Sequence, residues 1–186
     1  MKIRRFSLAV LLAFVLVPSL GLAAPDPLSY DDPGMHFRPP DGWVRVSLEE
    51  AGGDPSGGKP PAAVYILRKG PNDIRTIIIM IDSFNGQVDE LEHSHENELR
   101  KTNENTFIDK HEKTALANGM PAYWLRASEG KDLGAYKRRY EWVVADGARS
   151  IIVTYIGRQG VFDDKEAKDA LASLYVVAFP RGRRSN

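Results

Sequence analysis

Short stretches of alternating apolar and polar residues, separated by turn residues, follow one another after residue 34 and predict β-strands. The predicted strands are residues 35–38, 43–46, 63–67, 75–83, 107–116, 122–127, 136–145, 149–156 and 175–179. Residues 77–81 (IIIMI) are apolar at every position rather than at every second one. A strand of that kind must be covered on both faces, so we expect a layer on each side of the sheet.

Two stretches carry apolar residues at steps of three and four, which is the period of an amphipathic helix. The first is 88–102, with an inward stripe of Val88, Leu91, His95, Leu99 and Thr102. The second is 162–174, with an inward stripe of Phe162, Ala167, Ala170, Leu171 and Leu174. Helices set between hairpin-connected strands predict an α+β fold, in which a mostly antiparallel β-sheet is flanked by helices.

The dipeptides Asn-Gly at 118–119 and Asp-Gly at 146–147 predict two hairpins, because both favour the positive φ values of a two-residue type I′ turn. A two-residue turn also sets the register of the strands that it joins. The expected cross-strand pairs are Trp124 with Lys113, Arg126 with His111, Trp142 with Ile151 and Tyr140 with Val153. In the second hairpin this register places Tyr140 and Trp142 on an apolar face and Glu141 on the opposite face.

The N-terminal residues have the order of a secretory signal peptide. A basic start at 2–5 precedes an apolar run at 8–22, and the small residues Gly21 and Ala23 predict cleavage before Ala24. We therefore expect a signal peptide at 1–23, an extended leader at 24–34, a single domain at 35–180 and a basic tail at 181–186. The mature protein is then periplasmic or extracellular and keeps no stable membrane span.

Composition limits the classes of partner. The chain has 25 Lys and Arg residues against 25 Asp and Glu residues, a pI of about 6.9 and no cysteine. Because it has no global basic field, we expect it to bind no nucleic acid. Without cysteine it has neither a disulfide framework nor a thiol that could carry a lipid anchor.

No catalytic motif is found, and no cofactor is expected. The chain has no cysteine nucleophile, and no serine lies in a Gly-x-Ser-x-Gly elbow. His93, His95 and Glu96 come nearest to a metal site, since imidazoles and carboxylates bind zinc or copper. On a helix, however, residues two apart point about 200° apart, so His93 and His95 cannot bind one ion together there. We therefore predict neither an enzyme nor a metal site.

Aromatic and basic residues in the predicted strands suggest a binding face. In the expected register Trp124 lies opposite Lys113, with Tyr123 and Arg126 close by. A tryptophan in such a polar setting is typical of a protein interface. We therefore predict a partner-binding face formed by Trp124, Arg126, Lys113 and Tyr123. The alternative for these strand aromatics is an ordinary core.

The segments FRPPDGW at 37–43 and ANGMPA at 117–122 resemble the PsbP-like or Mog-like family. The order of the predicted elements from about residue 30 to residue 179 is also similar to that of the family. The resemblance implies an α/β/α sandwich around an antiparallel sheet. It also implies a non-catalytic binder, because the family includes an extrinsic photosystem subunit and DcrB-type bacterial envelope proteins. These members share a scaffold rather than a site, so the resemblance assigns no site residue.

Together these observations predict an exported accessory protein that binds another envelope protein. A small-molecule or lipid carrier that uses the aromatic face of the sheet is the alternative. The two differ in shape, because a carrier encloses an apolar cavity of roughly several hundred Å³, whereas a protein binder shows a flat or convex aromatic patch. The sequence names neither the partner nor the oligomeric state.

Overall fold

The computed structural model describes residues 26–52, 59–102, 106–130, 137–158, 160 and 163–178. The predicted signal peptide, the basic tail at 181–186, Phe162 and Phe179 lie outside the described residues. The described residues form β1 (Tyr30–Asp32), β2 (Met35–Phe37), β3 (Val44–Val46), β4 (Ala63–Gly70), β5 (Asp73–Ser83), α1 (Val88–Thr102), β6 (Thr106–Ala115), β7 (Pro121–Glu129), β8 (Lys137–Ala145), β9 (Arg149–Arg158), α2 (Asp164–Ala170) and β10 (Tyr175–Val176).

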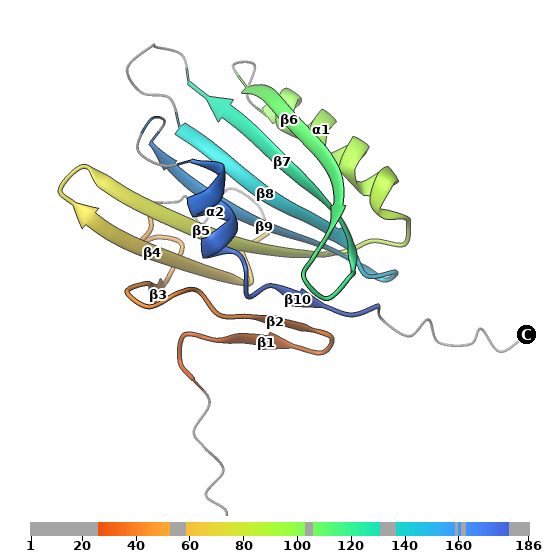
Figure 1. The fold of residues 1–186 in the computed structure, drawn as a ribbon, viewed down its shortest axis with the longest axis horizontal. Coiled ribbons are helices and arrows are strands. Elements are labelled where there is room, and N and C mark those ends of the chain that lie inside the picture. The colour runs from red at the N-terminus through yellow and green to blue at the C-terminus, as the bar shows by residue number, and fades with distance from the viewer. Residues whose placement is uncertain are drawn as a thin grey trace, which may run out of the picture.

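These strands form two antiparallel sheets (Figure 1). The large sheet has seven strands in the order β3-β4-β5-β9-β8-β7-β6, and the small sheet has the order β1-β2-β10. All of their pairings are antiparallel, which confirms the predicted α+β fold with a mostly antiparallel sheet. Strand β1 lies within the predicted leader at 24–34, so the leader contributes a strand to the fold.

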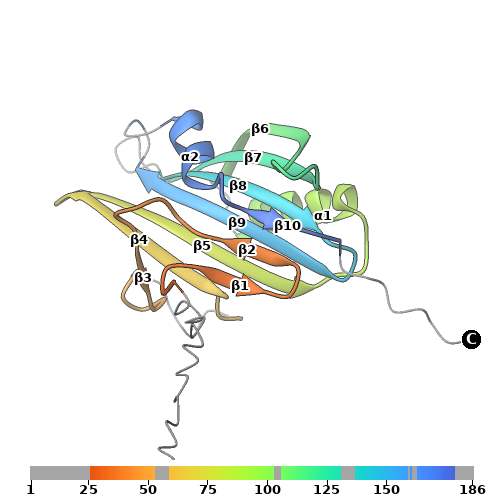
Figure 2. The same cartoon turned by 60° about the horizontal axis from the view of Figure 1, so that its bottom comes forward.

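Different elements cover the two faces of the large sheet (Figure 2). One face, which we call the core face, lies under α2 and the small sheet, and Tyr65 and Tyr155 are completely buried there. The opposite face, which we call the helix face, lies under α1, where Leu91 packs against Leu125 and Val143. Because side chains alternate along a strand, each strand of the large sheet supplies residues to both faces.

The apolar run of β5 is covered unequally on its two faces. Ile77 and Ile79 point to the core face and are completely buried. Ile78 and Met80 point to the helix face and are only half-buried, because α1 packs mainly on β6, β7 and β8. The prediction that both faces are covered is therefore right for the core face and wrong in part for the helix face.

Helix α1 begins and ends at the predicted residues. Its first turn carries Asp89 and Glu90 and its last turn carries Arg100 and Lys101, which are the charges that the helix dipole favours at those ends. The backbone N–H of Gln87 donates to Glu90 Oε2 at 3.2 Å and so satisfies one of the free donors at the start of the helix. The stripe is buried as predicted at Val88, Leu91, His95 and Leu99.

Helix α2 is shorter than predicted and ends at Ala170 rather than at Leu174. Asp163 is its N-cap and accepts a hydrogen bond from the Glu166 N–H at 2.9 Å. Leu171 has left the helical conformation, yet both Leu171 and Leu174 are buried in the core from the following turn. The inward stripe thus continues beyond the helix. Strand β10 is also shorter than predicted, with two residues.

The first predicted hairpin joins β6 and β7, but its turn differs from the expected one. The Leu116 N–H donates to the Met120 carbonyl oxygen at 2.9 Å, which leaves a loop of three residues rather than two. Gly119 takes a φ of 83°, whereas Asn118 does not have a positive φ. The Asn118 side chain instead donates to a backbone carbonyl oxygen of β10 at 2.7 Å. A contact with a distant strand therefore decides how this turn is built.

The second predicted hairpin joins β8 and β9, and its turn lies one residue later than expected. The Asp146 N–H donates to the Arg149 carbonyl oxygen at 3.1 Å, so Gly147 and Ala148 are the central residues. Gly147 has a φ of 97°, which matches a type II′ turn with glycine in the first central position. Asp146 Oδ1 accepts hydrogen bonds from the Ala148 and Arg149 N–H groups and stabilises this arrangement.

The two turns change the predicted registers in different ways. In the first hairpin Trp124 faces Glu112 rather than Lys113, which is a shift of one residue. In the second, Trp142 faces Val153, two positions from the predicted partner. Because the side-chain period of a strand is two, a shift of two residues leaves every side chain on its predicted face. The predicted apolar face of β8 and β9 is therefore confirmed although the pairs are wrong.

Gly119→Ala is expected to lower the free energy of unfolding by about 1–2 kcal/mol, because an alanine is strained in the left-handed region. No atom lies within 4 Å of the position of the added Cβ, so the loss would come from the backbone alone. Gly70→Ala is the control, since Gly70 is equally open and has no positive φ. Urea unfolding measures both variants, and equal effects would contradict the loop described above.

Candidate functional site

A groove of about 600 Å³ lies on the helix face, beside α1 and over the strands that α1 leaves partly uncovered. Its apolar lining consists of Met80 from β5, Ile152 from β9 and Leu99 from α1. Its polar lining residues are Asp82, His95, Glu98, Glu129, Arg139 and Thr154. The groove is open to solvent, so it combines accessible apolar side chains with charged walls.

Glu141 of β8 is completely buried on the helix face next to the groove and is the centre of a polar network. Its Oε2 lies 2.7 Å from His95 Nε2. Its Oε1 accepts hydrogen bonds from the Thr154 hydroxyl at 2.8 Å and from Arg139 Nε at 2.9 Å. Arg139 also donates to Glu129. Because each of these groups has a partner, the network is rigid and holds the groove wall in one arrangement.

The ionisation of Glu141 follows from these contacts. Burial alone would raise the pKa of Glu141, but the charge of Arg139 and the contact with His95 outweigh burial and lower it to about 2. Burial would also lower the pKa of Arg139, but Glu141 and Glu129 raise it above its ordinary value. The pair is therefore ionised near neutral pH, and the Glu141 carboxylate is a poor proton acceptor there.

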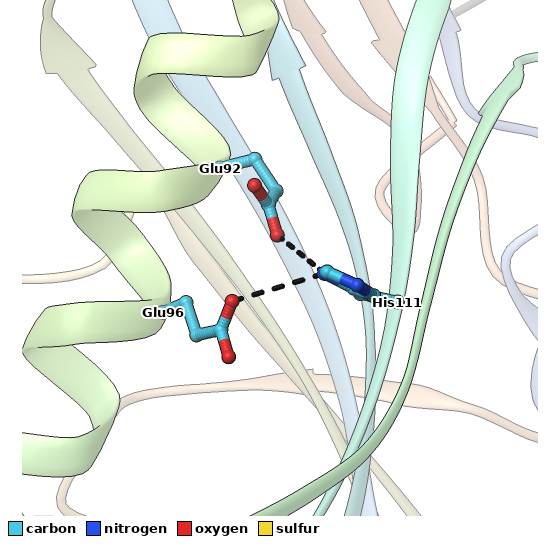
Figure 3. A group of neighbouring side chains, drawn as sticks. All are labelled: Glu92, Glu96 and His111. Carbon is cyan, nitrogen blue, oxygen red and sulfur yellow. Dashed lines mark hydrogen bonds and ion pairs between the residues drawn. The ribbon is translucent and has the colours of Figure 1, made fainter.

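A second polar cluster lies on the other flank of α1, where Glu92 and Glu96 face His111 of β6 (Figure 3). His111 Nδ1 is 3.0 Å from Glu92 Oε1 and 3.8 Å from Glu96 Oε2. The hydrogen bond that His111 makes to the Glu92 carboxylate raises the pKa of His111 above its ordinary value. One ligand atom from each of the three residues lies within 4.8 Å of the other two, so they could hold a metal ion.

The structure separates the histidines that the sequence singled out. His93 is exposed, whereas His95 is buried against Glu141. Glu96 forms no ion pair with His93 or His95 among the described residues. It pairs with Arg100 and faces His111. The helical argument against a joint site of His93 and His95 thus holds. The histidine that Glu96 faces is His111, which lies 15 positions further along the chain.

The predicted partner-binding residues do not form one face. Trp124 is completely buried on the core face, where it contacts Tyr140 and Trp142. Arg126 also lies on the core face and pairs with Asp109 at 2.8 Å. Lys113 and Tyr123 lie on the helix face, where Lys113 pairs with Asp89 at 2.6 Å. Trp124 as an interface anchor was therefore wrong, since a side chain with no exposed surface cannot contact a partner.

Sequence reasoning missed Glu92, His111, Arg139 and Glu141 as site residues. The spacing of Glu92 and Glu96 is a detectable signal, because residues four apart share one face of a helix. His111 carried no such signal, since its facing partner depends on how β6 lies against α1. Glu141 was placed on the correct face, but its burial depends on α1 packing over it.

Neither a family model nor a curated protein matches this sequence. The solved structures that are similar over most of the chain include two with a TM-score above 0.5. Cyanobacterial PsbP (CyanoP) from Synechocystis is 14% identical, and the match covers 86% of this chain and 99% of CyanoP with a TM-score of 0.57. LpqN of Mycobacterium tuberculosis, a protein involved in cell envelope biogenesis, is 17% identical, with coverage of 78% and 87% and a TM-score of 0.51. The fold is PsbP-like.

The PsbP-like fold confirms the architecture that the resemblance of 37–43 and 117–122 implied. At this level of identity the likeness extends to the fold and not to the site residues. In the part of the chain that the structure describes, no helix is both long enough and apolar enough to cross a membrane.

Glu141→Gln is expected to cost about 3 kcal/mol of unfolding free energy at pH 7, because each pKa unit is worth about 1.4 kcal/mol and the pKa falls from 4.5 to about 2 on folding. The lowered pKa means that the stabilisation is complete above the unfolded value and is lost as the pH falls towards 2. The cost should therefore shrink between pH 5 and pH 2 in urea titrations. Glu98→Gln on the exposed rim is the control, and a pH-independent cost at Glu141 would contradict this assignment.

Trp124→Ala is expected to destabilise the PsbP-like fold by about 3–5 kcal/mol, because it would leave a large cavity beside Tyr140 and Trp142. Lys113→Ala, on the exposed edge strand, should change stability far less than Trp124→Ala, because Lys113 lies at the surface. Thermal and urea unfolding measure both variants. A cost at Trp124 as small as that at Lys113 would show that the indole is not part of the core.

Proposed function

We propose that this chain is an exported accessory protein of the cell envelope that binds a segment of another envelope protein in the groove beside α1. The observation that supports this proposal is the lining of the groove. In the described part of the chain it brings accessible apolar side chains next to charges that are already held in place. An exposed strip of this kind on a folded sheet is typical of a recognition site.

The chemistry of the lining defines the segment that fits. Met80 and Ile152 are half-buried and can cover one apolar side chain of a partner. Arg139 is engaged by Glu129, and Asp82 is paired with Lys59 at 2.6 Å. Glu98 is exposed and forms no ion pair among the described residues. The free charge of the groove is therefore negative, and a segment with an apolar residue next to a lysine or arginine complements it.

The groove differs from both shapes that the sequence led us to expect, because it is a concave surface rather than a flat or convex aromatic patch and it is open rather than enclosed. Its openness is the feature that argues against a lipid or small-molecule carrier. A carrier is expected to enclose its ligand in a mostly apolar cavity. This groove is open, and six of its nine lining residues are polar or charged. Placing an acyl chain against the exposed carboxylate of Glu98 would remove water from it without returning hydrogen bonds, which is unfavourable.

The charged groups of the groove also favour binding over catalysis. Glu141 has a pKa of about 2, well below the value that suits a general base near neutral pH. Arg139 and His95 are both directed at Glu141. The hydrogen bonds of this network therefore join its residues to one another, and the network forms a rigid wall of the groove.

Two observations support a place in the envelope. The residues at 1–23 have the order of a secretory signal peptide, although they lie outside the described residues. LpqN, which shares the fold, is involved in cell envelope biogenesis. Export would bring the groove into the same compartment as its proposed partner.

Site-specific photo-crosslinking tests this proposal. A photoreactive amino acid at Glu98, in the exported protein of the native host, is expected to capture one envelope protein that the same probe at Glu49 does not capture. The purified pair should then bind, and Glu98→Lys should weaken that binding about tenfold or more by placing like charges together.

Glu49→Lys is the matched control, because Glu49 is exposed outside the groove and the substitution changes the net charge equally. Equal effects of the two variants, or equal capture at both positions, would contradict the groove as the binding site. A lipid or small molecule retained in stoichiometric amount, seen by native mass spectrometry of protein from the envelope fraction, would favour the carrier instead.

A further inference from the structure

We propose that Glu92, Glu96 and His111 form a binding site for a divalent transition-metal ion, and that zinc fits it best. Glu92 and Glu96 project from successive turns of α1, and His111 projects from the edge strand β6 (Figure 3). The site is separate from the groove, which lies on the opposite flank of α1 and contains His95. It brings together residues from two elements that meet only in the folded chain.

The three ligand atoms lie within 4.8 Å of one another, and two of the distances between them are close to those of a zinc site. Zinc binds histidine nitrogen and carboxylate oxygen at about 2.0–2.2 Å, so ligand atoms of a tetrahedral site lie roughly 3.3–3.5 Å apart. His111 Nδ1 lies 3.0 Å from the Glu92 oxygen and 3.8 Å from the Glu96 oxygen. These values lie on either side of the required separation, so small side-chain rotations would complete the site.

The burial of Glu92 provides an independent argument. Its side chain is only 10% exposed, and its polar partner among the described side chains is the His111 imidazole. A carboxylate this deeply buried normally contacts a cation, because burying an uncompensated charge is costly. Among the described residues no lysine or arginine forms an ion pair with Glu92, and its basic partner is His111. A bound divalent ion would take the place of the proton that lies between these two side chains.

Glu96 is already oriented for the same role. Arg100, four residues later on α1, donates from Nη2 to Glu96 Oε1 at 2.6 Å. Glu96 Oε2 is left to face His111. Holding one carboxylate oxygen by a second side chain while the other binds the ion is a common way to orient a metal ligand.

The ligand set selects among ions. Magnesium and calcium prefer oxygen ligands alone, so the imidazole disfavours both. Two carboxylates and one histidine suit zinc with a fourth position taken by water. The His111 side chain is 60% exposed, so that position can open to solvent. The neighbouring Lys110 does not oppose the ion, since it pairs with Glu112 and Asp164.

A metal here would have a structural consequence. Among the described strands, β6 lies at the edge of the large sheet and pairs only with β7. An ion that joins His111 to two residues of α1 would tie this edge to the helix. We therefore expect zinc to slow amide hydrogen exchange around His111 as well as to raise the melting temperature.

Isothermal titration with Zn²⁺ tests the proposal, with the exported protein purified without a polyhistidine tag. One ion per chain is expected, and excess Mg²⁺ should not displace it. His111→Ala and Glu92→Gln should each weaken zinc affinity at least about tenfold. His111 is largely exposed, so its replacement should leave the fold intact by circular dichroism.

His93→Ala is the matched control, because it removes an exposed histidine of the same helix outside the site. It should leave the zinc affinity unchanged, as should Glu98→Lys in the groove. The proposal is overturned if the folded protein takes up no zinc. It is equally overturned if His93→Ala abolishes binding, or if His111→Ala and Glu92→Gln leave binding unchanged.

Discussion

Neighbouring strands of a sheet lie about 4.8 Å apart, so the seven strands from β3 to β6 span roughly 29 Å. A helix with its side chains is only about 10–12 Å wide. Helix α1 packs on β6, β7 and β8, and it leaves Met80 and Ile152 half-buried beside it. The groove is the direct result of this difference in width. On the core face, residues of α2 and of the small sheet pack together with the large sheet in one hydrophobic cluster.

The buried network of Glu141 lies at the border between the covered and uncovered parts of the helix face. His95 reaches it from α1, and Arg139 and Thr154 reach it from the sheet. A charge in such a place is tolerated only when all of its hydrogen bonds are made. The same contacts that satisfy Glu141 also fix the groove wall, so stability and the shape of the proposed binding surface rest on one set of residues.

Helix α1 separates two kinds of chemistry because of its own periodicity. His95 and Leu99 lie four residues apart and face the groove, whereas Glu92 and Glu96 lie four residues apart and face β6. The exposed face between them carries His93. A partner in the groove and an ion at the carboxylates would therefore occupy opposite flanks of one rigid helix, with no ligand residue shared.

The sequence by itself determined the elements and the faces. The apolar steps of 88–102 predicted α1 to the residue, and the alternation in 136–156 placed Tyr140 and Trp142 opposite Glu141 on the sheet. These properties are local, because they depend on the period of each element. The fold class followed from their order along the chain. Short motifs added the PsbP-like architecture, which the likeness to CyanoP confirms.

Only the tertiary structure decided the registers and the sites. Asn118 bonds to β10, and Asp146 holds a turn one residue later than expected, so the turn types depended on contacts that the dipeptides do not reveal. A register shift of one residue placed Glu112 rather than Lys113 opposite Trp124. Packing against Tyr140 and Trp142 buried the Trp124 side chain. The groove and the Glu92–His111 contact arise where α1 meets the sheet. Both sites are formed by residues that lie far apart in the chain, so no local sequence pattern predicts them.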